Sequence, residues 1–178
     1  MITLLIATNR PESNSAKVAA HVVEIYAEKG VPLHVLDLHT LPPEIFSPSS
    51  YATKPAAFGP FQDAISTATG LVVVMPEYNG GFPGVFKYFV DMLKFPESFV
   101  GKPFAFVGLS AGLGGAGRPI AQFQVLVTYL QGVLYPASVF IPGIYGHLDE
   151  TGRLKTPELI ERIGKQAEGF AKFVQRFA

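Results

Sequence analysis

The chain has 178 residues, of which 48% are hydrophobic and 16% charged, and its 14 basic side chains equal its 14 acidic ones in number. A net charge of zero argues against a nucleic-acid-binding protein, because phosphate contacts need an excess of lysine and arginine. The absence of cysteine excludes disulfides, thiolate chemistry and cysteine-ligated metal centres, and we expect no metal site. The length suits one domain, expected to span residues 1–178.

Two features bear on where the protein works. No basic segment precedes the first apolar run, so we expect no signal peptide and a cytoplasmic protein. Residues 119–146 carry no charged side chain, a length that would suffice for a membrane helix. Glutamine, glycine and proline interrupt this stretch, and we interpret it as a buried helix followed by a buried strand, without membrane contact.

Five short apolar runs alternate with stretches of helical periodicity. The runs are apolar on both faces, which is typical of buried parallel strands. The predicted strands are Ile2–Ala7, Pro32–Leu38, Leu71–Met75, Pro103–Leu109 and Tyr135–Ile141. The predicted helices are Ala16–Tyr26, Ala56–Ala68, Pro83–Lys94, Gly115–Gln131 and Thr156–Phe177. A surface loop at residues 41–54, rich in proline and serine, is a candidate to reach over the site.

This alternation predicts an α/β protein with three α/β/α layers and a five-stranded parallel sheet in the flavodoxin-like order 2-1-3-4-5. In such sheets ligands bind beyond the carboxyl ends of the strands, at the point where the strand order reverses. The loops after the first, third and fourth strands, residues 8–15, 76–84 and 110–117, are therefore predicted to hold the function.

The first of these loops suits a monophosphate. It joins a buried strand to the start of a helix, where backbone N–H groups and the helix dipole favour an anion. The alternative is that one serine simply caps the helix, which explains one hydroxyl and leaves the others. The candidate phosphate ligands are Thr8, Arg10, Ser13, Asn14 and Ser15.

The second loop reads P-E-Y-N-G-G and ends the third strand at a proline. Its asparagine and glycines adopt positive φ at little cost, which leaves backbone groups and a tyrosine facing outward. A planar heterocycle is able to lie against such a backbone, although an ordinary strand-to-helix joint is the alternative. The candidate contacts are Pro76, Glu77, Tyr78, Asn79 and Gly80.

The third loop matches two catalytic signatures, G-x-S-x-G and G-x-G-x-x-G. A serine hydrolase of that type places its acid and then its histidine after the serine, yet no acid lies between Ser110 and His147, the last histidine. A dinucleotide fingerprint needs an acid about 20 residues further on, and the next one here is Asp149. A tight turn that lets a helix pack close to the sheet is the simpler reading. Ser110 and Gly112 remain candidate contacts of a ligand.

Together, the P-E-Y-N-G-x-x-P-G-x-x-K block, the R-x-x-S-x-S of the first loop and the S-x-G-x-x-G of the third resemble the NADPH-dependent FMN reductase family. Relatives in this family include chromate, quinone and azo-dye reductases. The resemblance extends over nearly the whole chain. It implies a flavodoxin-like fold that binds FMN noncovalently, usually in a homodimer or homotetramer, and takes hydride from NADPH or NADH.

By position, the resemblance implies that Arg10, Ser13 and Ser15 hold the FMN phosphate, that residues 76–80 lie along the isoalloxazine, and that Ser110 sits at its pyrimidine side. The family's initial Gly-Ser is Ala7-Thr8 here, and its Lys-Asn and Asp-Trp pairs on the following helix are Lys87-Tyr88 and Asp91-Met92. The chemistry belongs to the flavin, so no protein residue is assigned a catalytic role.

The resulting expectation is an oxidoreductase that passes hydride to FMN and then to a small acceptor: a quinone, an azo compound, an oxidised metal anion or free flavin. A non-enzymatic electron carrier and a flavin-free binding module on the same fold remain alternatives. The neutral net charge argues against a carrier, which is commonly acidic. The helix at Pro119–Gln131 is apolar nearly all round. We expect its outer side to meet another subunit, or else to be covered by the chain's own long loop.

Overall fold

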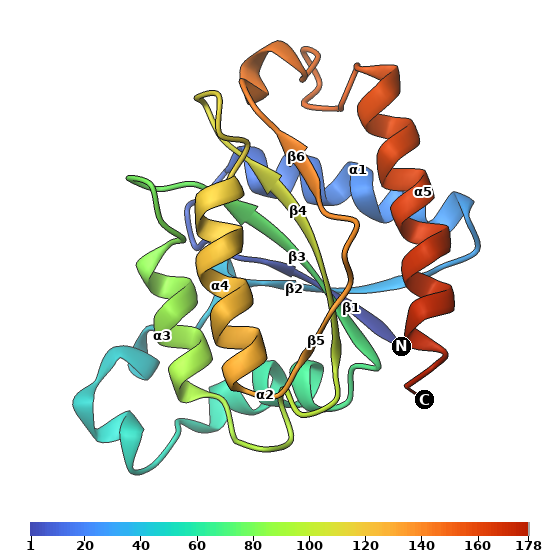
Figure 1. Cartoon of the computed structure of the whole chain (residues 1–178). Helices are drawn as coiled ribbons and strands as arrows, with labels where there is room; N and C mark the ends of the chain where they lie inside the picture. Colours follow the sequence, from blue (N-terminus) through green and yellow to red (C-terminus); the bar gives the residue numbers. More distant parts are fainter. Residues whose placement is uncertain (178) are drawn as a thin grey trace.

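The computed structural model describes residues 1–177 as a parallel β-sheet with helices on both faces (Figure 1). The order β2-β1-β3-β4-β5 is the predicted one, and a sixth strand also pairs with β4. The flavodoxin-like α/β architecture is therefore confirmed. The strands are β1 (Ile2–Ile6), β2 (Leu33–Asp37), β3 (Gly70–Pro76), β4 (Pro103–Leu109), β5 (Val133–Leu134) and β6 (Val139–Ile141).

The predicted extent of the fifth strand, Tyr135–Ile141, is wrong. Two short strands, β5 and β6, lie beside β4 in place of one continuous strand. β5 pairs with Pro103 and Phe104 at one end of β4, and β6 pairs with residues 107–109 at the other. Pro136 lies between them, and proline has no N–H with which to continue a ladder. Residues 119–146 thus form a helix and two strands, and no helix within residues 1–177 is long and apolar enough to cross a membrane.

Burial of the strands follows their place in the sheet. Every residue of β1, β3 and β4 is buried. The expectation of two buried faces is wrong for β2, where His34 is exposed and Val35 is 44% exposed, and for β5, whose two residues are only half-buried. β2 and β5 are the two outermost strands of the sheet, so less of the protein covers them.

Two separate cores flank the sheet. On one face, α1 (Asn14–Glu28) and α5 (Pro157–Val174) pack against each other and against aliphatic side chains of the strands. On the other face lie α2 (Gly59–Ser66), α3 (Gly84–Met92) and α4 (Gly117–Tyr129). This second core is rich in phenylalanine: the rings of Phe123 and Phe86 lie 4.6 Å apart, and four further phenylalanine rings surround Phe123.

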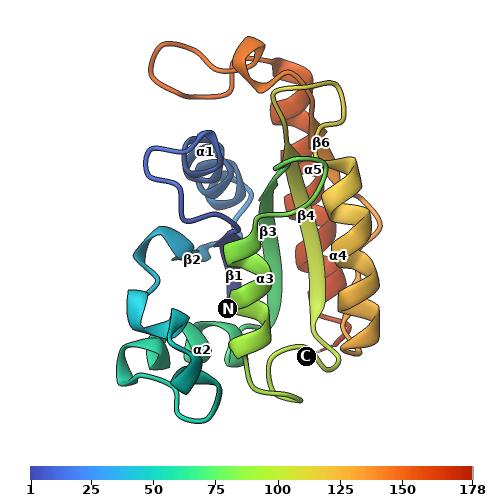
Figure 2. The ribbon, with the colours of Figure 1, turned by 90° about the vertical axis from the view of Figure 1, so that its left-hand side faces the viewer.

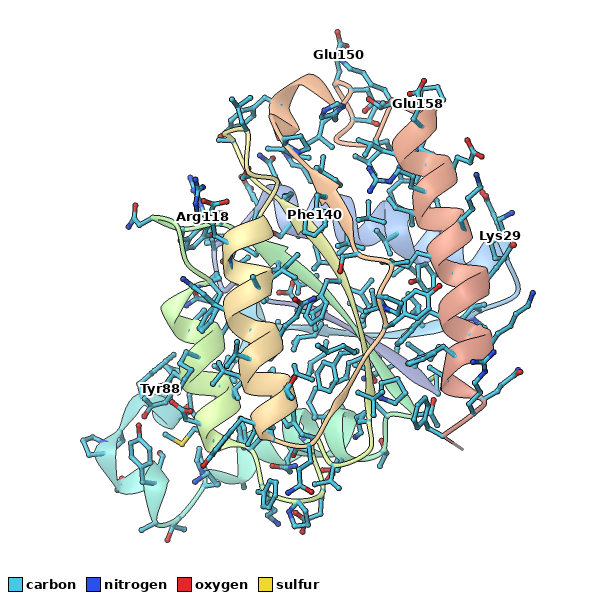
Figure 3. The ribbon with its side chains drawn as sticks, viewed as in Figure 1. Lys29, Tyr88, Arg118, Phe140, Glu150 and Glu158 are labelled. Atoms are coloured by element: carbon cyan, nitrogen blue, oxygen red, sulfur yellow. The ribbon has the colours of Figure 1, made fainter. Side chains whose placement is uncertain are left out.

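The long loop after β2 lies beside α3 and away from the carboxyl ends of the strands. It folds into short 3₁₀ turns, including Pro43–Phe46 and Pro48–Tyr51. The Tyr88 hydroxyl donates a hydrogen bond to the Ile45 carbonyl at 2.9 Å, and its ring packs against Phe46 and Tyr51. Figure 3 shows Tyr88 on the side of α3 that faces this loop. The hypothesis that residues 41–54 reach over the site is therefore wrong, since none of them lines the cavity.

Candidate functional site

A cavity of about 440 Å³ opens beyond the carboxyl ends of β1, β3 and β4. Its volume falls within the range of roughly 300–1,000 Å³ that is usual for small-molecule sites. All three predicted loops contribute to it, together with the segment that follows β6. The predicted site residues that line it are Arg10, Ser13, Asn14, Ser15, Pro76, Glu77, Tyr78 and Ser110.

The first turn of α1 forms one end of the cavity. Ser13 caps the helix, because its hydroxyl accepts a hydrogen bond from the Ala16 N–H at 3.1 Å. Within residues 1–177 no acceptor pairs with the N–H groups of Ser13, Asn14 and Ser15. Unpaired N–H groups at a helix N-terminus carry partial positive charge and favour an anion.

Two side chains add to this positive end. Arg10 lines the cavity, and its guanidinium forms no ion pair with residues 1–177. The Ser15 hydroxyl is likewise without a hydrogen-bond partner in the described chain, although its residue is only 2% exposed. The capping alternative therefore explains Ser13 and leaves Arg10 and Ser15 available to a ligand.

The second loop is a tight hairpin. Tyr78 and Gly81 exchange two backbone hydrogen bonds of 2.8 and 2.9 Å. Between them Asn79 and Gly80 have φ values of 51° and 79°, as a type I′ turn requires. The Tyr78 hydroxyl hydrogen-bonds with the Thr8 hydroxyl at 2.8 Å, so the first and second loops are joined beneath the cavity.

Glu77 connects the second loop with α4. One carboxylate oxygen pairs with Arg118 at 3.2 Å, and the other is buried without a hydrogen-bond partner among residues 1–177. A buried carboxylate oxygen normally has a partner, so this one is an unsatisfied acceptor beside the Arg118 ion pair. Gly114 is close to the pair: an added Cβ there would lie 3.0 Å from Glu77 Oε2. Figure 3 shows Arg118 at the start of α4.

The third loop does not contain a hydrolase nucleophile. The Ser110 hydroxyl donates to the Gly112 carbonyl at 2.8 Å and accepts from the Gly115 N–H at 2.9 Å, so both of its hydrogen bonds stabilise the turn in which it lies. His147 instead pairs with the Thr156 hydroxyl at 2.7 Å. The glycines let the loop approach the sheet, since a Cβ on Gly108 would lie 2.5 Å from the Gly115 carbonyl oxygen.

Four predicted site residues lie outside the cavity. Thr8 is buried beneath it, held by Tyr78. Asn79, Gly80 and Gly112 line a neighbouring hollow of about 220 Å³, which shares Glu77 and Ser110 with the cavity. Asn79 and Gly80 form the tip of the hairpin, which lies outside the cavity, and Gly112 is exposed to solvent.

Other cavity residues were not named as individual contacts, although Pro11, Glu12 and Ala111 lie in the predicted loops. They are Pro11, Glu12, Leu109, Ala111, Ile144 and Tyr145. Ile144 and Tyr145 follow the last strand, so the rule that ligands bind at the carboxyl ends of strands would have found them if applied there too. Glu12 has a φ of 50°, an uncommon conformation of the kind that clusters at functional sites. Within residues 1–177 no group of three or more His, Asp or Glu side chains is placed to hold a metal ion.

The fold defines the protein as a flavodoxin-like α/β protein, with a cavity at the switch point of the sheet. The solved structure of FerB, a flavoenzyme NAD(P)H:(acceptor) oxidoreductase from Paracoccus denitrificans, matches with a TM-score of 0.81 at 20% identity. The match covers 99% of this chain and 97% of that one, and at this identity it shows the shared fold.

Sequence comparison identifies the family. The model of the NADPH-dependent FMN reductase family matches residues 1–146, and the chain belongs to this family of oxidoreductases that use FMN and NAD(P)H. An NAD(P)H-dependent FMN reductase from Pseudomonas aeruginosa is 30% identical over 83% of this chain and 80% of its own length. A quinone reductase from Pseudomonas putida is 27% identical over 99% of this chain and 92% of its own length. The predicted family, enzyme class and cofactors are confirmed.

Proposed function

We propose that the protein is an FMN-dependent NAD(P)H:quinone oxidoreductase, with the flavin in the 440 Å³ cavity. One observation carries the proposal: the cavity joins a polar end, made of unpaired N–H groups and Arg10, to a backbone wall at Pro76–Tyr78. FMN has the same two-part chemistry, a phosphate joined by a polyol chain to a planar ring.

The polar end fits a phosphate monoester. Arg10 provides a guanidinium with several donors, and Ser15 provides a hydroxyl without a protein partner. Asn14 lies between them at the start of α1, where the helix dipole is positive. In this proposal Ser13 contributes its backbone N–H, because its hydroxyl already caps the helix.

The other walls fit the ring and its polar edge. Pro76, Glu77 and Tyr78 form a ledge that the Thr8–Tyr78 hydrogen bond holds in place. In this arrangement the rim of the ring lies toward the neighbouring hollow that Asn79, Gly80 and Gly112 line.

FMN supplies the redox chemistry when bound, accepting hydride from the nicotinamide and passing two electrons to an acceptor. The residues of this chain would bind the flavin and orient it for the donor and the acceptor. No protein side chain is given a proton-transfer role, because the redox chemistry is carried by the flavin.

Among small acceptors we propose quinones over azo compounds, oxidised metal anions and free flavin. The support is the relative named quinone reductase that matches over 99% of this chain. Purified holoenzyme assayed with NADPH against a benzoquinone, an azo dye, chromate and FMN should give the highest kcat/KM for the quinone. A higher kcat/KM for any of the other three would replace the quinone as the proposed acceptor.

The first experiment is the visible spectrum of the purified protein, followed by NADPH under anaerobic conditions. A flavin band that bleaches on addition of NADPH is the expected result. A flavin band that NADPH does not bleach would favour the electron carrier, and a colourless protein that FMN does not reconstitute would favour the flavin-free binding module.

The phosphate assignment has its own test in Arg10→Ala. Loss of a charge-assisted hydrogen bond should raise the Kd for FMN by about tenfold or more, measured by flavin fluorescence. Arg162→Ala is the matched control, because Arg162 is an exposed arginine on α5 away from the cavity. Equal Kd values for the two variants would contradict a phosphate at Arg10.

We also propose that the protein forms a homodimer through α4. The helix buries Ile120, Phe123 and Val127 against the sheet but leaves Val125 and Tyr129 69% and 81% exposed. The long loop does not cover these side chains, which removes the alternative in which the chain covers its own helix. Light scattering should give a mass of twice 19.2 kDa, falling toward the monomer mass in Val125→Asp. A monomer mass for the unmodified protein would refute the dimer.

Two further proposals concern the whole chain. Residues 1–178 act as one domain, which is supported by two cores built on opposite faces of one sheet. The proposed compartment is the cytoplasm, where reduced nicotinamide nucleotides are available.

A further inference from the structure

The loop between β6 and α5 (residues 142–156, the β6–α5 loop) stands over the start of α1. Figure 2 shows it, in orange, reaching out above α1, in blue. Ile144 and Tyr145 of this loop line the 440 Å³ cavity. Tyr145 and Asn14 also line an outer hollow that contains Lys17. Tyr145 therefore lies between the polar end of the cavity and this outer hollow, and its residue is 72% exposed.

The cavity side of the loop is fixed to the third loop of the site. The Gly143 N–H donates to the Gly112 carbonyl at 2.9 Å, and the Ile144 N–H donates to the Ser110 carbonyl at 3.0 Å. Gly143 has a φ of 57°, which turns the chain into the short 3₁₀ helix that presents Tyr145. The backbone that carries Tyr145 is thus positioned by the site itself.

The far end of the loop is fastened to α1. Arg153 forms an ion pair with Glu24 at 2.6 Å, and the Leu154 N–H donates to Nδ1 of the buried His21 at 3.1 Å. The tip between these anchors is folded on itself, since the Asp149 carboxylate accepts from the N–H groups of Thr151 and Arg153. Figure 3 shows Glu150 at this tip, pointing away from the protein.

We propose that Tyr145 covers the phosphate end of the bound flavin and that the Arg153–Glu24 pair, outside the cavity, sets how long the flavin stays bound. This inference rests on the proposed function. A wall over the phosphate excludes water, and the attraction between phosphate and Arg10 strengthens as the local dielectric falls. Flavin release then requires Tyr145 to move aside, so contacts that hold the β6–α5 loop in place slow dissociation. Tyr145 touches the ligand in this arrangement, whereas Glu24 and Arg153 are positioning residues.

Flavin dissociation from the holoenzyme tests the role of Tyr145. Stopped-flow fluorescence after dilution into a flavin trap should show Tyr145→Ala releasing FMN about tenfold faster, whereas Tyr145→Phe, which keeps the ring, stays within about twofold of the unmodified enzyme. Tyr51→Ala is the matched control, because Tyr51 is 60% exposed and lies in the loop beside α3. Unchanged release from Tyr145→Ala would overturn the inference.

The positioning role is tested by Glu24→Gln. It should release FMN about threefold faster, with the rate of flavin reduction by NADPH and the Tm both unchanged. Glu161→Gln is its control, since it removes the exposed Glu161–Lys165 pair on α5, which has the same 2.6 Å length. In the Tyr145→Ala background Glu24→Gln should have no further effect, because the wall is already gone. Additive effects of the two changes, or equal effects of Glu24→Gln and Glu161→Gln, would refute the coupling.

The same measurements separate this inference from the proposed function. If the unmodified protein binds no FMN, the proposed function fails and the inference fails with it. If the unmodified protein binds FMN and Tyr145→Ala releases it at the same rate, this inference fails and the proposed function stands.

Discussion

A single methyl group on Gly108 should destabilise the protein, whereas the same change at Gly112 should not. Gly108 lies in β4, where the turn before α4 comes closest to the sheet. An added Cβ would be 2.5 Å from the Gly115 carbonyl oxygen and 2.7 Å from Ile120 Cδ1. The carbonyl is backbone and cannot rotate away, so either the turn or the strand must move. At Gly112 no heavy atom lies within 4 Å of the added Cβ.

The expected cost follows from the contact. Overpacking of a well-packed core typically costs about 1–3 kcal/mol. For a chain of this length a loss of about 2 kcal/mol lowers the Tm by about 4–8 °C. Gly112→Ala should leave the free energy of unfolding unchanged or raise it by up to about 1 kcal/mol, since alanine restricts the unfolded chain.

Urea unfolding followed by circular dichroism, without added flavin, measures both variants. The midpoint for Gly108→Ala should fall by about 1 M at an m value near 2 kcal/mol/M. The two glycines occupy the first and last positions of the same G-x-S-x-G match, so they form a matched pair. Equal unfolding free energies for Gly108→Ala and Gly112→Ala would refute the argument that the first glycine is required by the close approach of the turn.

Three further predictions concern stability. Phe123→Ala should cost about 3–5 kcal/mol, because its ring lies at the centre of the aromatic core, and a loss below about 1 kcal/mol in urea unfolding would contradict this. Burial, and to a smaller extent the Arg153 charge, lower the pKa of His21. Near pH 6 the unfolded chain therefore binds more protons than the folded chain, and the free energy of unfolding should fall as the pH drops below 6.5. In thermal melts at different pH values, His21→Asn should lose less stability in acid than the unmodified protein. Burial lowers the pKa of Lys102 from 10.5 to about 8, so the free energy of unfolding should rise by about 2 kcal/mol between about pH 8 and about pH 10. Lys102→Met should lack this rise. Parallel pH profiles of the two proteins would show that Lys102 is not its source.

Much of the fold follows from local patterns. The apolar runs give the strands, and the strand–helix alternation gives the parallel order that the sheet adopts. Local chemistry also predicts positive φ at Asn79, Gly80 and Gly81 and the possibility that a serine caps α1. The prediction holds for Asn79, Gly80 and the cap, whereas Gly81 pairs with Tyr78 without a positive φ. These features depend on neighbours within a few residues, which is why sequence alone reaches them.

Other features of the site needed the assembled structure. The split of the last strand depends on which part of β4 each half meets, since β5 and β6 are too short to be recognised alone. The Glu77–Arg118 pair joins residues 41 positions apart, and the Thr8–Tyr78 hydrogen bond joins residues 70 positions apart. No sequence spacing identifies such partners.

The sequence by itself determined the family, the order of the elements and the sheet edge at which the site lies, because hydrophobic periodicity, turn residues and the P-E-Y-N-G block are written along the chain. Only the tertiary structure decided that Ser110 serves its own turn, that Tyr145 completes the cavity and that the loop at residues 41–54 does not. The physical reason is that each of these outcomes depends on distances between segments far apart in sequence, and those distances are set when the two cores pack against the sheet.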